Sequence, residues 1–249
     1  MIPILCEDPS FLVINKPAGW LCQAPPGVPN LQAELAAQIK QRDGHPGNPF
    51  VGLPHRLDRS TTGTLLVARH QRALKRFCAQ FQSRKIRKWY LAVVEGELPP
   101  GAPMRWIDYV RKLPGQPVAE IVPDRAAEHA REAVLEAHVL AAADGCSLLK
   151  IDLHTGRMHQ IRIQAASRGW PVVGDQLYGA NRVLAPVATS ADSDTAYREM
   201  RIALHAARLE FFHPTTAKKV HVVAPLPEYW HELPGIMKVA SDWLQRPVP

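Results

Sequence analysis

The chain has 249 residues, of which 46% are hydrophobic, so it can bury a packed core and is not a disordered protein. Lys and Arg outnumber Asp and Glu by 30 to 23, which gives a formal net charge of +7 at pH 7. Nine of these cations and no acid fall in residues 59–94, so the remaining 21 cations and 23 acids sum to −2. Solvated protein faces usually mix both signs. The localised charge therefore favours a nucleic-acid surface over the alternative of an ordinary solvated helix face.

The cysteines and the apolar runs indicate a cytoplasmic protein. Cys6, Cys22, Cys78 and Cys146 are scattered, without a close-spaced pair or a zinc-type spacing, so we interpret them as reduced thiols. The N-terminus lacks the basic and apolar regions of a secretory signal, and no apolar run approaches the roughly 20 residues that span a bilayer. We therefore expect neither secretion nor a membrane partner.

The first part of the chain predicts a strand, a helix and a loop before a second strand. The apolar residues 11–14 predict a buried strand that ends in a turn at residues 15–19. Residues 31–39 are predicted as a short helix and the Pro- and Gly-rich residues 44–54 as a loop. The apolar residues 64–68 follow as the next strand.

A helix is predicted from His70 onward, because apolar residues recur there at helical spacing. They are Leu74, Phe77, Cys78 and Phe81. We expect these aromatic rings in the core rather than on a base-stacking surface, with Arg72, Lys75 and Arg76 on other faces. Residues 88–94 are predicted as a strand and the proline-rich residues 99–117 as a loop.

Two further strands are predicted at residues 132–140 and 147–153. A helix is predicted to begin near Met158 and to stop at Gly169, with a proline just beyond it. The polar residues 184–198 are predicted as a mobile insertion.

The chain then returns to strands, with residues 204–212 and 218–223 predicted as a hairpin. Strands and helices are mixed along the chain without strict alternation, which favours the α+β class. We expect a single domain over residues 1–249.

One acid stands alone at the entrance of the basic segment. Asp58 ends the sequence HRLD at residues 55–58, and no other acid follows until Glu95. Hydroxyls and Gly63 come next. A lone carboxylate among cations suits a reactive group that meets a polyanion.

The HRLD sequence resembles the catalytic motif of the RluA-type RNA pseudouridine synthases, in which a Thr-Ser-Gly follows two residues later. Thr62 replaces the serine here and keeps a hydroxyl. Further motifs that resemble the family occur in the expected order. They are Ile14-Asn15-Lys16-Pro17-Ala18-Gly19, Lys88-Trp89-Tyr90-Leu91-Ala92, Gly156-Arg157-Met158-His159-Gln160-Ile161-Arg162, Pro171-Val172-Val173-Gly174-Asp175 and Leu204-His205-Ala206.

This resemblance implies the pseudouridine synthase fold, a mixed, mostly antiparallel central sheet flanked by helices and loops. In many members a small RNA-binding S4 domain precedes the first strand, and there is no room for it before residue 11. We therefore expect a stand-alone catalytic domain that is a monomer and binds structured tRNA or rRNA.

The implied reaction breaks the N1 to C1′ bond of uridine and joins C5 of the same uracil to that carbon. No atom is gained except by proton exchange, so we expect no cofactor. A carboxylate can act as nucleophile or as base in such a cleavage. The resemblance assigns this catalytic role to Asp58.

The resemblance also assigns roles to three other side chains. Arg162 is the cation that keeps Asp58 ionised, although a surface helix arginine is the simpler interpretation without its motif. Arg56 fills the gap left by a flipped base, with a phosphate contact as the alternative. Tyr90 stacks on the base and assists proton transfer, with a plain core aromatic as the alternative.

The remaining candidates are assigned to substrate binding. They are His55, Arg56, Thr62, Arg157, His159 and Gln160. For His159 a hydrogen-bonding scaffold role is the simpler interpretation. The histidines are not clustered as in zinc sites, so we expect no metal. Two other functions stay open: an inactive RNA-binding protein of this fold, and a metal-independent ribonuclease using His55 or His159.

Overall fold

The computed structural model describes residues 1–25, 27–44, 46–184 and 201–247. These residues divide into two compact units. The first unit holds residues 1–87 and 206–225, and the second holds residues 88–184, 201–205 and 226–247. The single-domain prediction stays a prediction.

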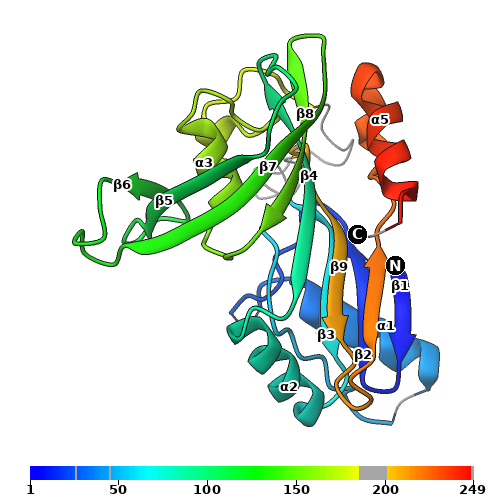
Figure 1. Ribbon diagram of the computed structural model, residues 1–249. Helices are drawn as coiled ribbons and strands as arrows, with labels where there is room; N and C mark the ends of the chain where they lie inside the picture. Colours follow the sequence, from blue (N-terminus) through cyan, green and yellow to red (C-terminus); the bar gives the residue numbers. More distant parts are fainter. Residues whose placement is uncertain (26, 45, 185–200, 248–249) are drawn as a thin grey trace. The chain divides into compact units, whose positions relative to one another are not determined.

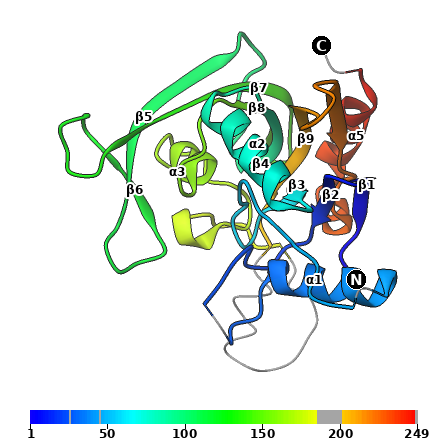
Figure 2. The ribbon, with the colours of Figure 1, turned by 90° about the horizontal axis from the view of Figure 1, so that it is seen from below.

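The first unit is built on a sheet whose strands pair mostly antiparallel (Figure 1). They are β1 (Ile4–Asp8), β2 (Phe11–Lys16), β3 (Thr62–Ala68), β9 (Leu204–Phe212) and β10 (Lys219–Val223). The strand order is β1-β2-β3-β9, and β10 pairs with β9. The hairpin predicted at the end of the chain is confirmed, with Phe212 opposite Lys219. The helices α1 (Leu31–Asp43) and α2 (Gln71–Gln82) lie on the two sides of this sheet (Figures 1 and 2).

An aromatic cluster joins α2 to the sheet. Phe77 of α2, Phe11 of β2 and Phe211 of β9 are all buried, and their rings meet edge to face at 5.1 to 6.0 Å between centroids. Phe81 packs against the same cluster. The prediction that the aromatic residues of this helix belong to the core is therefore confirmed. Its N-terminus is capped by His70 Nδ1, which accepts the Ala73 N–H at 3.1 Å.

Gly63 sits where β3 meets β9, and no other residue fits there. Its φ is +110°, and an added Cβ would lie 2.2 Å from the carbonyl oxygen of Ala206. Thr64 Oγ1 donates to that same oxygen at 3.1 Å. The glycine that follows the HRLD motif therefore lets two strands approach closely.

The second unit holds five antiparallel strands. They are β4 (Arg87–Glu95), β5 (Met104–Lys112), β6 (Ala119–Val122), β7 (Arg131–Ala143) and β8 (Cys146–Leu153), in the order β4-β8-β7-β5-β6. The helices α3 (Gln160–Ala166) and α5 (Pro234–Gln245) lie on opposite sides of β7 and β8 (Figures 1 and 2). Short 3-10 turns occur at Gln176–Tyr178 and Glu228–Glu232.

The prediction of a loop over residues 99–117 is wrong. Residues 104–112 form β5, which pairs along its length with β7. Trp106 and Val110 are buried, whereas Arg105 and Ile107 are exposed. The prolines lie on either side of β5 rather than within it, so they interrupt no ladder hydrogen bond.

Other boundaries differ less. The predicted helix 158–169 begins two residues later, because His159 has a φ of +51° and precedes the first helical residue. The helix α3 ends at Ala166, close to the predicted end at Gly169. Gly169 has a left-handed backbone conformation, with a φ of +80°. The strands β1 and β6 and the helix α5 were not predicted. Residues 185–198 of the predicted insertion lie outside the described residues.

Both units combine strands with helices, so the predicted α+β class with a mixed, mostly antiparallel sheet is confirmed. Among the described residues, no helix has the length and apolar character needed to cross a membrane.

Candidate active site

Asp58 lies in a turn between the loop and β3 of the first unit. Its side chain is partly exposed, whereas the preceding Leu57 is buried. The Asp58 carbonyl accepts the Thr61 N–H at 3.1 Å, which closes the turn. We call residues 55–61 the Asp58 loop. Its geometry depends on contacts with a distant segment, residues 16–22.

Lys16, at the end of β2, is fully buried and holds the Asp58 loop by its backbone. Its Nζ donates to the carbonyl oxygens of Arg59 at 3.0 Å and Thr61 at 2.8 Å, and to that of Pro17 at 3.0 Å. An ammonium has three protons, so these three acceptors use all its donors. Burial lowers the pKa of Lys16 to about 8, while the nearby Cys22 and Asp58 act in the opposite direction.

Two more contacts connect the same segments. Cys22 Sγ donates to the Leu57 carbonyl at 3.2 Å and accepts the Leu57 N–H at 3.4 Å. Burial raises the pKa of this thiol, which keeps it protonated. Arg59 Nε donates to the Gly19 carbonyl at 3.0 Å, and the Gly19 N–H returns a bond to the Arg59 carbonyl at 2.9 Å. The backbone on both sides of Asp58 is therefore fixed.

The predicted substrate-binding residues of this loop differ in their surroundings. His55 Nε2 accepts the Leu66 N–H of β3 at 3.0 Å, and its ring lies 4.7 Å from that of Phe81 in α2. Thr62 is buried at the start of β3, whereas Arg56 is exposed. The contacts of His55 indicate that it positions the loop. Substrate contacts of all three residues stay predictions.

Arg162 of the second unit forms a buried ion pair that the sequence did not reveal. Its Nε and Nη2 donate to Asp175 Oδ2 and Oδ1 at 2.6 and 2.7 Å, with side-chain exposures of 5% and 0%. The guanidinium also lies over the ring of Tyr178, 5.0 Å from its centroid. Asp58 belongs to the other unit, so the predicted pairing of Arg162 with Asp58 stays a prediction. The signal for Asp175 was its place in the motif at residues 171–175.

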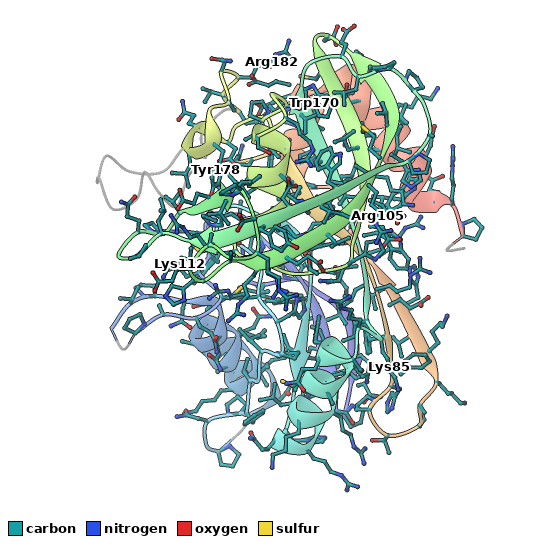
Figure 3. The ribbon with its side chains drawn as sticks, turned by 60° about the vertical axis from the view of Figure 1, so that its left-hand side comes forward. Lys85, Arg105, Lys112, Trp170, Tyr178 and Arg182 are labelled. Carbon is teal, nitrogen blue, oxygen red and sulfur yellow. The ribbon has the colours of Figure 1, made fainter. Side chains whose placement is uncertain are left out.

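Tyr178 extends this cluster beside α3 (Figure 3). Its hydroxyl lies 2.8 Å from His159 Nδ1 and accepts the Ala119 N–H of β6 at 3.0 Å. His159 thus connects the turn before α3 to β6 through one hydroxyl. This geometry suits the scaffold role considered for His159.

Gln160 and Arg157 fix the same turn to the sheet. The buried Gln160 Oε1 accepts the Thr155 hydroxyl at 2.8 Å and the Arg157 N–H at 3.0 Å. Its Nε2 donates to the Val134 carbonyl at 3.2 Å, and Arg157 Nε donates to the Glu132 carbonyl at 2.8 Å. These hydrogen bonds fix the backbone that leads to Arg162, so Gln160 has a structural role. Substrate binding by either residue stays a prediction.

Tyr90 is buried in β4, opposite Ile151 of β8. Lys88 precedes it by two residues and therefore shares its face of the strand. Burial lowers the pKa of Lys88 to about 8, and the nearby Asp152 opposes this shift. The sequence singled out Tyr90 alone, because periodicity does not show that a strand lysine will be partly buried. Among the described residues, no three His, Cys, Asp or Glu side chains gather as a metal-binding group.

Comparisons with known proteins agree with these motifs. Residues 10–167 match the RNA pseudouridylate synthase family. The chain is 36% identical over 228 residues to ribosomal large subunit pseudouridine synthase D of Xylella fastidiosa, which covers 91% of this chain and 66% of that protein. It is 35% identical to the protein of the same name from Xanthomonas campestris, and this match covers 96% of this chain and 70% of that protein. The chain therefore belongs to the RNA pseudouridine synthase family, whose class of reaction is the isomerisation of uridine to pseudouridine in RNA.

Solved structures show the same fold. Human RNA Pseudouridylate Synthase Domain Containing 4 aligns with a TM-score of 0.70 at 23% identity, covering 99% of this chain and 94% of that one. Human RNA Pseudouridylate Synthase Domain Containing 1 aligns with a TM-score of 0.68 at 24% identity. The chain spans about two thirds of the length of the bacterial relatives it matches.

Proposed function

We propose that this chain isomerises specific uridines in structured RNA, with Asp58 as the catalytic carboxylate. The observation that carries the proposal is the clamped Asp58 loop: Lys16 and Cys22 fix its backbone while the Asp58 side chain stays partly exposed. A rigid backbone under an accessible carboxylate is the arrangement that preorganised catalysis requires. Large-subunit ribosomal RNA is our first candidate substrate, from the names of the bacterial relatives, and transfer RNA is the second.

The chemistry needs one reactive carboxylate. The carboxylate of Asp58 assists cleavage of the N1–C1′ bond, either as nucleophile at C1′ or as base. The detached uracil turns and forms the C5–C1′ bond, the hydrogen at C5 leaves as a proton, and N1 gains one. Atoms and electrons balance within the substrate and water.

Access to C1′ requires that the uridine leave its stack, so we propose base flipping. Arg56 supports this step by its position, because it is exposed and lies two residues from Asp58. A guanidinium can stack on neighbouring bases and also pair with phosphate. We further propose catalytic roles for Arg162, as a cation that favours an ionised carboxylate, and for Tyr90, as a ring that stacks on the base.

We also propose that the protein acts as a monomer in the cytoplasm. The four cysteines are free thiols, which is typical of reducing compartments.

Release of tritium tests the reaction. RNA transcribed with uridine tritiated at C5 loses the label to water only where a carbon bond forms at C5. We expect release in proportion to product, with end-labelled RNA of unchanged length. An inactive RNA-binding protein would release no tritium, and a ribonuclease would shorten the RNA without release.

A further inference from the structure

The helix α2 carries cations that no described residue neutralises. Arg72 and Lys75 lie on its outer face, and Arg84 and Lys85 follow its C-cap, Ser83. All four side chains are exposed, and none forms an ion pair with another described residue. We call these four residues the α2 basic face; Lys85 lies beside the end of the helix in Figure 3.

Other arginines of the first unit are paired instead. Arg42 contacts Glu7 and Asp43, each at 2.6 Å. Arg69 contacts Glu7 at 2.8 Å and Asp43 at 3.6 Å. Arg76, which belongs to α2, donates a hydrogen bond to the Pro214 carbonyl and so has a structural role. Glu7 and Asp43 therefore neutralise the arginines near β1, and the α2 basic face keeps its positive potential.

The stability of α2 does not explain these cations. Arg72 lies in the first turn, where the helix dipole disfavours positive charge, and that turn holds no acid. Arg72 and Lys75 are three residues apart, so their like charges repel on one face. The helix is held by its buried residues, Ala73 and Phe77, and by the His70 cap. A local arrangement that opposes stability points to a function.

The α2 basic face is joined to the Asp58 loop within one unit. The ring of Phe81 in α2 lies 4.7 Å from that of His55, which begins the loop. No aromatic side chain belongs to the basic face, because Phe77 and Phe81 pack into the core. The face therefore offers charge for phosphates and no ring for stacking on bases.

We infer that the α2 basic face binds the phosphate backbone of the RNA beside the target uridine. This inference rests on the proposed function, since it extends the footprint of the same substrate. Phosphate contacts position an RNA without reading its sequence. The face therefore governs affinity and its dependence on salt, whereas the Asp58 loop governs the reaction.

The test compares two charge-matched double variants. Arg72→Ala with Lys75→Ala removes two cations from the α2 basic face. Lys40→Ala with Lys218→Ala removes two exposed cations elsewhere on the same unit. Binding of a fluorescein-labelled RNA hairpin is measured from 50 to 300 mM KCl. We expect the first variant to flatten the plot of log K against log salt by roughly one to two units, and the control to match wild type. Equal slopes in all three proteins, or equal flattening in both variants, would overturn the inference.

A charge reversal, Lys75→Glu with Lys85→Glu, repeats the binding measurement with a second pair of substitutions. Thermal unfolding checks that each variant is folded.

Tritium release from a large-subunit ribosomal RNA transcript then separates the two proposals. We expect the α2 variants to raise KM several-fold and to leave kcat within about twofold, because uniform binding is lost. If wild type releases no tritium, the proposed function fails while the salt slopes still decide the inference. If release is normal and the slopes are unchanged, only the inference fails.

Discussion

Asp58 and Arg162 are held in opposite ways. The Asp58 loop of the first unit is fixed through its backbone, by the ammonium of Lys16 and the thiol of Cys22, and its carboxylate is partly exposed. Arg162 of the second unit is fixed through its charged group, in a buried pair with Asp175. A group held by its backbone keeps its side chain available for a substrate, whereas a buried ion pair makes a rigid anchor. Substitutions in the two regions should therefore separate activity from stability.

The largest expected loss of stability is in the second unit. Arg162→Met leaves the Asp175 carboxylate buried without its partner, which should lower the free energy of unfolding by about 3–5 kcal/mol. Arg162→Met combined with Asp175→Asn removes both charges and should recover at least about 1 kcal/mol of that loss. Urea unfolding of the four proteins of this cycle measures the coupling. Additive effects of the two substitutions would mean that the pair is not the anchor.

A smaller loss is expected for Lys16→Met in the first unit. The carbonyls of Pro17 and Thr61 lose a charged donor, which should cost about 2–4 kcal/mol. Turnover should fall at least about tenfold, because the Asp58 loop is no longer fixed. Lys40→Met is the control, since it removes an exposed lysine of α1. Wild-type turnover in Lys16→Met would show that the clamp does not position Asp58.

The lowered pKa of Lys16 also predicts a dependence on pH. Below pH 8 the lysine is protonated in both the folded and the unfolded chain. Between about 8 and its ordinary value of 10.5 the unfolded chain holds more protons, so folding gains stability as the pH rises. The stability advantage of wild type over Lys16→Met should therefore grow from pH 8 to pH 10. Urea unfolding at each pH measures it, and a constant difference would contradict the lowered pKa.

The smallest effect is expected for Cys22→Ala, which removes the thiol that is hydrogen-bonded to the backbone of Leu57. Thiol hydrogen bonds are weak, so the loss should be about 1 kcal/mol, with turnover reduced a few-fold. Cys78→Ala, in α2, is the matched control and should leave turnover unchanged. Equal effects of the two substitutions on turnover would argue against a role for Cys22 in the loop.

Sequence patterns predicted the helices and strands of the first unit better than those of the second. The apolar run of β2 and the helical spacing of Phe77 and Phe81 encode their elements locally, and both were predicted. The strand β5 was missed because the prolines around it suggested a loop, although they lie outside its ladder. Pairing with β7 is a long-range property that a local pattern does not carry.

The candidate site shows the same division. The lone acid in the HRLD sequence identified Asp58, because its charge contrast with the segment that follows is visible in the chain. Lys16 and Cys22 were not assigned roles. A lysine in a turn motif is typical of the surface, and an isolated cysteine is typical of the core. Their contacts with the Asp58 loop span 35 to 45 residues of sequence. Asp175 was likewise found only when the structure placed it against Arg162.

The central claim is that Asp58 carries the chemistry on a loop that is already in place. Asp58→Asn keeps the shape of the side chain and removes its charge, so the direct test is single-turnover tritium release by this variant, with RNA affinity measured in parallel. We predict that release falls by roughly three orders of magnitude while affinity changes by no more than a few-fold. Retention of more than about a tenth of the wild-type rate would contradict the assignment of Asp58 as nucleophile or base.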